Sequence, residues 1–293
     1  MKGKRTIEPL LRQALAEDRA RADVTSRALL GPKTTIRAAI IAKASGILAG
    51  GAIAAHTFRL VDPSLRCIVH LRDGARLRPG QRILSIWGRA RPIFAAERTA
   101  LNVLAHLCGI ATLTHRYVQR VRPSRAQILD TRKTLPGLRA LQKYAVRVGG
   151  GRNHRSDLAA AILIKTNHLR AAQCGMRNAE CGITIKDAIT KARCVRPKRF
   201  VEVEVTNLQE FRAALEARPD AILLDNWTLP SVRRTVLLRK SALRTLHSAP
   251  LLEVSGGVNL GNVRQFAKAG VDRLSIGRLT HSVHALDVSL RVR

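Results

Sequence analysis

Two hydrophobic patterns divide the chain. In the first third, apolar residues recur at helical spacing in two segments, and short β-rich runs are separated by turn signals such as Pro79-Gly80. These patterns predict helices within 1–29 and 52–60, and strands within 34–48, 67–71 and 82–87. Helices combined with strands that are joined by tight turns indicate a small α+β domain with an antiparallel sheet. Residues 93–122 predict long helices that bridge two domains.

From about residue 123 short apolar runs alternate with helical stretches. The predicted strands are 127–129, 161–164, 200–205, 221–224, 251–254 and 273–276, and the predicted helices are 136–148, 208–217, 229–238 and 260–269. Alternation of this kind is typical of parallel strands joined by crossover helices. We therefore expect an α/β protein, in which an N-terminal α+β domain with an antiparallel sheet precedes an incomplete β/α (TIM-like) barrel.

A chain of 293 residues is long enough for two domains. The boundaries that we expect are 1–115 for the N-terminal α+β domain, 116–278 for the β/α barrel catalytic domain, and 279–293 for a C-terminal helix that packs back on the N-terminal domain. The longest apolar run, Ala159–Ile164, is too short to span a bilayer and predicts a buried strand.

The cysteines and the N-terminus indicate a compartment. Five cysteines are scattered along the chain without a CxxC pair, which argues against a disulfide framework and a zinc site and favours a reducing environment. Met1–Ala20 carries charges throughout and lacks the apolar core of a secretory signal. We expect a cytoplasmic protein.

The formal net charge of +32 raises the question of a nucleic-acid partner. The charge comes mostly from arginines that recur along the whole chain rather than in a tail or a patch, and aromatic residues make up only 3% of the chain, which leaves little for base stacking. We expect no nucleic-acid partner and no membrane partner. A field of this sign would still steer anionic substrates.

Groups able to do chemistry follow each of the six predicted barrel strands. In order they are Asp130–Lys133, Lys165–His168, Glu204 within its strand, Asp225-Asn226, Ser255–Gly257 and Gly277. The carboxyl ends of barrel strands converge on one face, where the active sites of such enzymes lie. The sequence therefore predicts an enzyme.

A first group of these residues is cationic: Arg132, Lys133, His154, Arg155 and Lys165. Arginine forks bind carboxylates and phosphates through two hydrogen bonds, so the group suits a small polyanion such as a dicarboxylate. Two alternatives are open at this point. The charges are solvated in an arginine-rich protein, or Lys165 is a Schiff-base nucleophile.

A second group, Ser255, Gly256, Gly257 and Gly277, lies where barrels commonly hold a phosphate. Between the two groups, Glu204 and Asp225 suit ribose hydroxyls, a Mg²⁺ that bridges phosphates, or a positively charged sugar carbon. Glu202 lies on the same strand face as Glu204, and we expect it deeper in the barrel and paired with a cation. Neither His154 nor His168 has metal-ligand spacing to another histidine, so we expect no zinc site.

These residues belong to motifs that occur in order over nearly the whole chain. The motifs are Glu17-Asp18, Asp23–Ser26, Glu97–Asn102, Gly109–Thr112, Asp130–Gly137, Lys143–Ala145, Gly149–Gly151, Asn153–Arg155, Val201–Val205, Leu224–Asn226, Ser255–Val258, Ser275–Gly277 and Leu279–Ser282. In them the chain resembles the quinolinate phosphoribosyltransferase family, which makes nicotinate mononucleotide for NAD biosynthesis.

The resemblance implies a transferase that joins quinolinate to phosphoribosyl pyrophosphate with Mg²⁺ and releases pyrophosphate and CO₂. It implies a homodimer or higher homo-oligomer in which Arg98 completes the neighbouring site. By analogy Lys133, Lys165, Glu204 and Asp225 are catalytic, and Glu204 and Asp225 face Mg²⁺ and the ribose. Quinolinate would be held by Arg98, Thr131, Arg132, Lys133, His154, Arg155 and Lys165, and the phosphoribosyl group by Glu204, Asp225, Ser255, Gly256, Gly257 and Gly277.

The chain departs from the family pattern at four positions. Thr166 stands where the family has an acid, Ala22 and Cys108 replace a glycine and a serine, and Arg278 replaces a small residue beside the phosphate glycine. Three alternatives stay open: the related branch found with molybdenum-transport genes, nicotinate phosphoribosyltransferase, and a basic RNA-binding protein on a retired enzyme scaffold. The retained Lys165, Glu204 and Asp225 favour an active enzyme.

Overall fold

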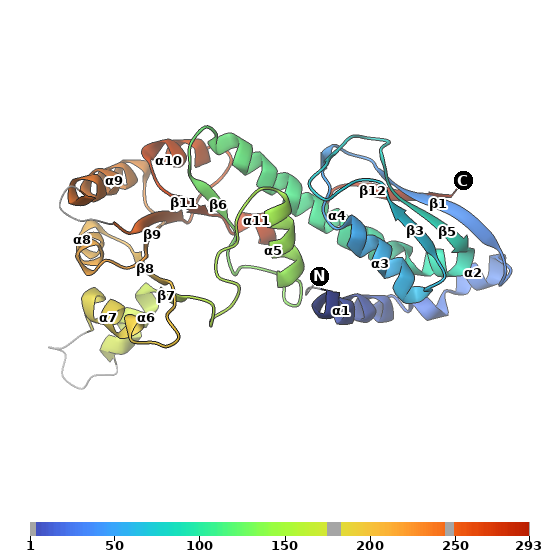
Figure 1. Cartoon of the computed structure of the whole chain (residues 1–293), viewed down its shortest axis with the longest axis horizontal. Helices are drawn as coiled ribbons and strands as arrows, with labels where there is room; N and C mark the ends of the chain where they lie inside the picture. Colours follow the sequence, from blue (N-terminus) through green and yellow to red (C-terminus); the bar gives the residue numbers. More distant parts are fainter. Residues whose placement is uncertain (1–3, 175–182, 244–248, 293) are drawn as a thin grey trace. The chain divides into compact units, whose positions relative to one another are not determined.

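The computed structural model describes residues 4–174, 183–243 and 249–292, and its chain divides into two compact units (Figure 1). Unit 1 comprises residues 1–115, 133–151 and 278–293, and unit 2 comprises 116–132 and 152–277. Residues 133–151, which we assigned to the barrel domain, therefore belong to unit 1. The reason is that the buried face of the helix they form, which includes Leu141 and Ala145, packs on a short helix at 278–281 of the same unit.

Unit 1 contains the antiparallel sheet that the sequence predicts. Its four strands run in the order β12-β1-β5-β3, and a separate pair joins β2 to β4. Its strands are β1 (Thr35–Ala42), β2 (Gly46–Ile47), β3 (Arg66–Val69), β4 (Arg76–Leu77), β5 (Arg82–Arg89) and β12 (Val288–Val292). Its helices are α1 (Lys4–Glu17), the 3-10 helix η1 (Ala20–Ala22), α2 (Val24–Leu29), α3 (Gly51–Val61), the first part of α4 (Ala90–Val121), α5 (Arg139–Val148) and α11 (Arg278–His281).

The core of unit 1 lies between this sheet and helices α3 and α4. Ile40 and Ile86 from the sheet, Phe58 from α3 and Leu104 from α4 are all fully buried in one apolar cluster. Apolar residues at helical spacing on α3 and α4 and at alternate positions on β1 and β5 produce these two matching faces. The predicted helices of 93–122 form one helix, α4, which passes from unit 1 into unit 2.

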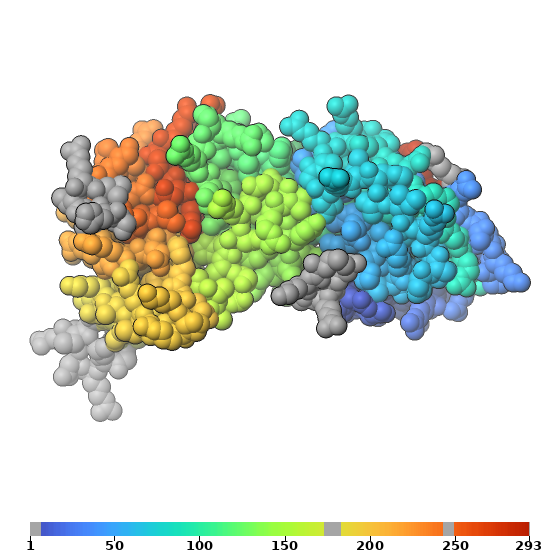
Figure 2. All heavy atoms as spheres, viewed as in Figure 1, coloured from blue at the N-terminus to red at the C-terminus, as the bar shows by residue number. Residues whose placement is uncertain are grey.

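The C-terminal segment corrects one prediction. We expected a helix over 279–293, but after the short helix α11 the chain forms β12, which pairs antiparallel with β1 from Ala42↔Val288 to Ala38↔Val292. The sequence Val-Ser-Leu-Arg-Val alternates apolar and polar residues with a period of two, and β-branched residues favour a strand. In the space-filling view the red C-terminal atoms accordingly lie among the blue and cyan atoms of unit 1 (Figure 2).

Unit 2 alternates strands and helices. Its strands are β6 (Gln127–Leu129), β7 (Ile162–Ile164), β8 (Val201–Val205), β9 (Ala221–Asp225), β10 (Leu251–Ser255) and β11 (Arg273–Ser275). Its helices are the end of α4, α6 (Thr166–Cys174), α7 (Ile185–Arg193), α8 (Leu208–Ala217), α9 (Leu229–Leu243) and α10 (Val263–Ala269). All six strands pair in parallel in the order β6-β11-β10-β9-β8-β7, so β6 and β7 stand at the two ends of the sheet. This is the incomplete β/α barrel that the alternation predicts.

The two faces of this sheet differ in polarity. On β8, Val203 and Val205 are fully buried on the side that the helices cover, whereas Glu202 and Glu204 belong to the other face. Residues that are register partners lie on the same face of the sheet. Leu223 of β9 is the partner of both Glu204 on β8 and Glu253 on β10, and Glu253 is also the partner of Arg273 on β11. Glu204, Glu253 and Arg273 therefore share this face. Chemistry-bearing side chains are thus concentrated on the face that the helices leave uncovered.

No helix in the ranges that the structure describes has the length and apolar content needed to cross a membrane.

Candidate active site

The carboxyl ends of the strands in unit 2 carry the side chains that the sequence predicts. Lys165 follows β7 directly, Glu204 is the penultimate residue of β8, and Asp225 and Ser255 end β9 and β10 in register with each other. Gly277 lies two residues after β11. The alternation of side chains places the first four on the uncovered face of the sheet, so one edge of unit 2 gathers these five predicted site residues.

Glu204 and Asp225 are both half-buried and both accept hydrogen bonds from the residues beside them. The backbone N–H and the hydroxyl of Thr166 donate to the same oxygen of Glu204, at 3.3 and 3.1 Å. The side-chain amide of Asn226 donates to Asp225 at 3.0 Å. A hydroxyl at position 166 therefore supports the carboxylate of Glu204, where an acid would meet it with like charge. Carboxylate oxygens are ligand atoms that suit a hydroxyl donor or a divalent cation.

The loop after β10 requires glycine. Gly256 and Gly257 have φ angles of +82° and +63°, and a Cβ on Gly256 would lie 2.1 Å from Oδ1 of Asn226. The Asn226 N–H donates to the carbonyl of Ser255 at 2.9 Å, which ties the ends of β9 and β10 together. Successive residues in this conformation can turn their N–H groups toward an anion. The next helix, α10, starts at Val263, three residues later than predicted.

Two of the predicted cations interact electrostatically. Burial lowers the pKa of the Arg155 guanidinium, and the positive charge of Arg132 lowers it further. Nη1 of Arg155 donates to the carbonyl of Ala161 at 3.1 Å, which fixes the side chain. Two guanidinium groups held together suit a ligand with more than one negative charge.

Asp130 anchors the segment that carries Arg155. It is fully buried at the end of β6, accepts the backbone N–H of His154 at 2.9 Å, and accepts a further hydrogen bond from the Asn153 side chain. A parallel bridge between Leu129 and Arg152 continues the pairing of β6 into this segment. Asp130 therefore has a structural role, although the sequence grouped it with the other polar residues at the strand ends.

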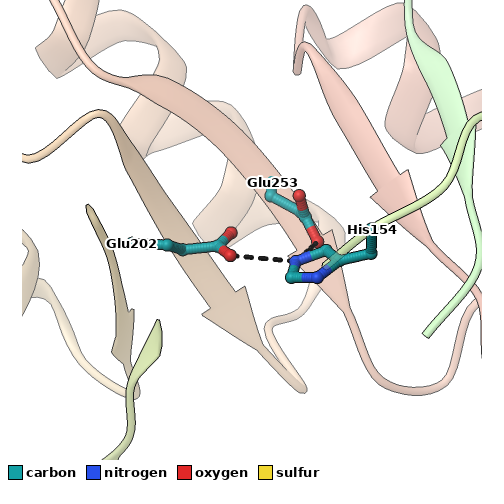
Figure 3. A group of neighbouring side chains, drawn as sticks. All are labelled: His154, Glu202 and Glu253. Carbon is teal, nitrogen blue, oxygen red and sulfur yellow. Dashed lines mark hydrogen bonds and ion pairs between the residues drawn. The ribbon is translucent and has the colours of Figure 1, made fainter. Parts of the chain in front are cut away.

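Below the strand ends, three ionisable side chains meet on the uncovered face of the sheet (Figure 3). Nε2 of His154 lies 2.9 Å from Oε2 of Glu202 on β8 and 3.4 Å from Oε1 of Glu253 on β10. Burial by itself lowers the pKa of His154, but the hydrogen bond with Glu202 and the nearby charges of Glu202 and Glu253 outweigh it and raise the pKa to about 9. The pKa of Glu202 is raised, first by its burial and then by the charge of Glu253.

Glu202 confirms the prediction of a deeper carboxylate paired with a cation. Glu253 was missed, because it lies 51 positions further along the chain and no local motif links it to Glu202 (253 − 202 = 51). The available signal was a charged residue inside the apolar run Leu-Leu-Glu-Val, on the same strand face as Ser255. A cavity of about 290 Å³ adjoins this group at the amino-terminal ends of the strands. Its lining includes Gln127, Ala161, Phe200, Arg273, His154 and Arg155.

Three other predicted site residues are placed as follows. Thr131 is half-buried and belongs to unit 2, next to Arg132. Arg98 and Lys133 belong to unit 1, where Arg98 is exposed on α4 and the backbone carbonyl of Lys133 accepts the Thr280 hydroxyl at 2.7 Å.

The Lys133 segment is held by a buried amide. Gln142 on α5 donates to the Thr280 carbonyl at 3.1 Å, accepts the N–H of Leu135 at 3.0 Å, and lies 2.9 Å from Nε2 of His106. Burial lowers the pKa of His106, which favours the neutral ring as the acceptor of that contact. Unit 1 therefore presents Lys133 on a rigid segment.

Comparison with known proteins covers nearly the whole chain. Residues 23–108 match the family described as Quinolinate phosphoribosyl transferase, N-terminal domain, and residues 110–291 match Quinolinate phosphoribosyl transferase, C-terminal domain. The nicotinate-nucleotide pyrophosphorylase [carboxylating] of Mycobacterium leprae is 41% identical over 283 residues, which are 96% of this chain and 95% of that protein. Quinolinate phosphoribosyltransferase [decarboxylating] 2, mitochondrial, of Nicotiana glauca is 36% identical over 98% of this chain and 82% of its own length.

A solved structure agrees with these relatives. The nicotinate-nucleotide pyrophosphorylase from Francisella tularensis superposes with a TM-score of 0.88 at 36% identity, over 98% of this chain and 96% of that one. Both domains and the fold are thus accounted for by one family. The chain belongs to the quinolinate phosphoribosyltransferase family.

Proposed function

We propose that the chain transfers the phosphoribosyl group of phosphoribosyl pyrophosphate to quinolinate and removes a carboxylate, giving nicotinate mononucleotide, pyrophosphate and CO₂ for NAD biosynthesis. The observation that carries the proposal is the polar edge of unit 2. There the carboxylates of Glu204 and Asp225 lie at the carboxyl ends of adjacent strands. Arg132 and Arg155 of the same unit, whose charges interact, suit a dicarboxylate. The names of the relatives support the same reaction.

The transfer step needs charge stabilisation more than a protein nucleophile. As pyrophosphate leaves, C1 of the ribose becomes positively charged, and the nitrogen of the pyridine ring attacks it. Glu204 and Asp225 would face the ribose and stabilise this charge, while Lys133 and Lys165 would offset the charge of the leaving group. Ser255, Gly256, Gly257 and Gly277 would hold the 5′-phosphate through backbone N–H groups.

The decarboxylation step needs little from the protein beyond orientation. The quaternised ring nitrogen stabilises the electron pair left at the neighbouring carbon when CO₂ departs, and a proton then replaces CO₂ at that carbon. Thr131, Arg132, Lys133, His154, Arg155 and Lys165 would hold the substrate carboxylates. Catalysis here consists mainly of positioning.

Magnesium fits the oxygen ligands at this edge. Glu204 and Asp225 end neighbouring strands, are half-buried and offer carboxylate oxygens, the ligand type that Mg²⁺ prefers. When bound with the substrate, Mg²⁺ would neutralise the charge of the departing pyrophosphate.

The partner and the compartment belong to the same proposal. We infer a homodimer or higher homo-oligomer in which Arg98, exposed on α4, reaches the site of the neighbouring subunit. The free thiols of Cys67, Cys108 and Cys194 support a reducing compartment, and we propose the cytoplasm.

The test is formation of nicotinate mononucleotide from quinolinate and phosphoribosyl pyrophosphate, with Mg²⁺ or with EDTA, by the wild type and by Arg132→Ala. We expect a magnesium-dependent product and a fall of at least about 100-fold in kcat/KM for quinolinate in the variant, because a buried charge-assisted pair is lost. A folded wild type that makes no product would refute the proposal. Product from nicotinate alone would indicate the other phosphoribosyltransferase reaction, and retention of RNA at moderate salt would indicate a nucleic-acid role.

A further inference from the structure

We propose that Glu202 and Glu253 are positioning residues for the substrate clamp. They fix the ring of His154, and through that ring they fix the backbone of Arg155. The guanidinium of Arg155, which also binds the carbonyl of Ala161, is thereby fixed for a ligand with two negative charges. The inference rests on the proposed function and adds to it two residues that do not touch the substrate.

The hydrogen bonds of the ring define its orientation. The backbone N–H of Arg155 donates to Nδ1 of His154 at 2.8 Å, so Nδ1 acts as an acceptor and the proton resides on Nε2. Nε2 then donates to Glu202 at 2.9 Å and faces Glu253 at 3.4 Å. The ring therefore connects β8 and β10 on one side to the Arg155 backbone on the other.

The clamp needs this support because its members repel each other. Burial lowers the pKa of Arg155 and the charge of Arg132 lowers it further, so the two cations oppose each other before a ligand binds. Asp130 holds the backbone of His154, and the carbonyl of Ala161 holds the Arg155 guanidinium. The carboxylates attach the imidazole itself.

The carboxylates in turn need the cations around them. Glu202 is 2% and Glu253 0% exposed, and Oε1 of Glu202 and both oxygens of Glu253 accept no hydrogen bond in the structure described. Nη1 of Arg273 lies 4.0 Å from Oε2 of Glu253, and its guanidinium stacks on Phe200 at 4.9 Å. The charge of Arg273 and the Nε2–H of His154 thus stabilise the two buried carboxylates, and removing either carboxylate changes the surroundings of the ring.

The same three side chains also meet the distance criterion for a cation site, since their ligand atoms lie within 4.8 Å of one another. Nε2 lies 2.9 Å from Glu202, and the backbone N–H of Arg155 donates to Nδ1. Both contacts favour a ring with its proton on Nε2, and a metal ion would have to displace that proton. Metal binding is therefore the competing outcome in the test.

The experiment is a set of double-mutant cycles. Glu202→Gln and Glu253→Gln are made in the wild type and in His154→Asn, whose shorter side chain can still accept the N–H of Arg155 but does not reach Glu202. Glu216→Gln, an exposed carboxylate on α8, is the matched control. KM for each substrate, kcat and the thermal midpoint are measured for every variant, the midpoint with and without added Zn²⁺ or Mn²⁺.

We expect each Gln variant to raise KM for quinolinate about 10-fold and to leave KM for phosphoribosyl pyrophosphate within about twofold. In the His154→Asn background the same variants should have no further effect on KM, because the effects of residues that act through one another are not additive. Equal increases in both KM values, or full additivity with His154→Asn, would overturn the proposal. So would a thermal midpoint that metal raises in the wild type and not in Glu253→Gln.

A second readout does not depend on activity. In protein labelled with ¹⁵N-histidine, a ring N–H proton protected from solvent should disappear in His154→Asn and shift in both Gln variants, but not in Glu216→Gln. A wild type without product but with this protected proton would refute the proposed function and leave the anchoring intact. An active wild type in which the His154 ring proton exchanges freely would refute the anchoring alone.

Discussion

Two glutamates on β8 lie two residues apart on the same face of the sheet, yet they have different surroundings. Glu204 is half-buried at the strand end and accepts hydrogen bonds from Thr166. Glu202 is 2% exposed and faces His154 and Glu253. The step along the strand is about 7 Å, enough to separate a carboxylate available to substrate from one that supports the site. Depth along the strand, rather than residue type, assigns the role.

The largest effect on stability should come from disrupting the buried group of His154, Glu202 and Glu253. Glu202→Ala removes the 2.9 Å partner of Nε2 of His154 and opens a cavity, so we expect a loss of about 3 kcal/mol in the free energy of unfolding. Urea denaturation measures it. Glu204→Ala, at the strand end, should change stability by less than about 1 kcal/mol. Equal losses would remove the difference between the two positions.

At the strand end the effect should be on rate. Asp225→Asn keeps the shape of the side chain and removes the charge that would face the ribose, so we expect kcat to fall about 100-fold. The thermal midpoint should stay within about 2 °C of the wild type. Steady-state kinetics at saturating substrates together with a melting curve give both numbers. A stable variant with normal kcat would place the chemistry elsewhere.

The buried group of His154, Glu202 and Glu253 should also make the stability of the protein depend on pH. Because the pKa of His154 is raised to about 9 from an unfolded value near 6.5, its contribution is fully present below pH about 6.5 and is lost as the pH rises through about 9. The Arg155 N–H at Nδ1 opposes protonation there, so we expect about 2 kcal/mol rather than the full shift. The stability difference between wild type and His154→Asn, followed from pH 6 to 10, measures it. A constant difference would contradict the assignment.

The smallest effect concerns the hydroxyl beside Glu204. Thr166→Val removes the 3.1 Å hydrogen bond but leaves the backbone N–H at 3.3 Å, so we expect a loss of about 1 kcal/mol in transition-state stabilisation, or about fivefold in kcat/KM. Thr166→Ser is the matched control and should behave as the wild type. A 100-fold loss in Thr166→Val would show that the hydroxyl itself participates in the chemistry.

The sequence predicted the strand ends well because their pattern is local. Each apolar run of the barrel ends within one residue of the observed strand, and Lys165, Glu204, Asp225 and Ser255 follow from that boundary alone. Roles that depend on distant pairing were harder to predict. Asp130 was grouped with the polar residues that follow the barrel strands, and the structure shows that it anchors the His154 backbone, a contact formed only when the chain returns after α5.

The strand at the C-terminus was missed for a related reason. The period-two pattern of Val288–Val292 was present, but its partner β1 lies some 250 positions earlier, and no local motif links the two segments (288 − 42 = 246). Glu253 was likewise invisible as a partner of Glu202 until the register of β8, β9 and β10 was known. Local pattern predicted the elements, and long-range register decided which charges meet.

The most direct test of the different roles of Glu202 and Glu204 is kcat at saturating concentrations of both substrates for Glu202→Gln and Glu204→Gln. Saturation overcomes a defect in quinolinate positioning but not a defect in charge stabilisation during transfer. We predict that Glu202→Gln keeps kcat within about fivefold of the wild type, whereas Glu204→Gln loses about 100-fold. Equal losses in both variants, or a larger loss in Glu202→Gln, would contradict the account.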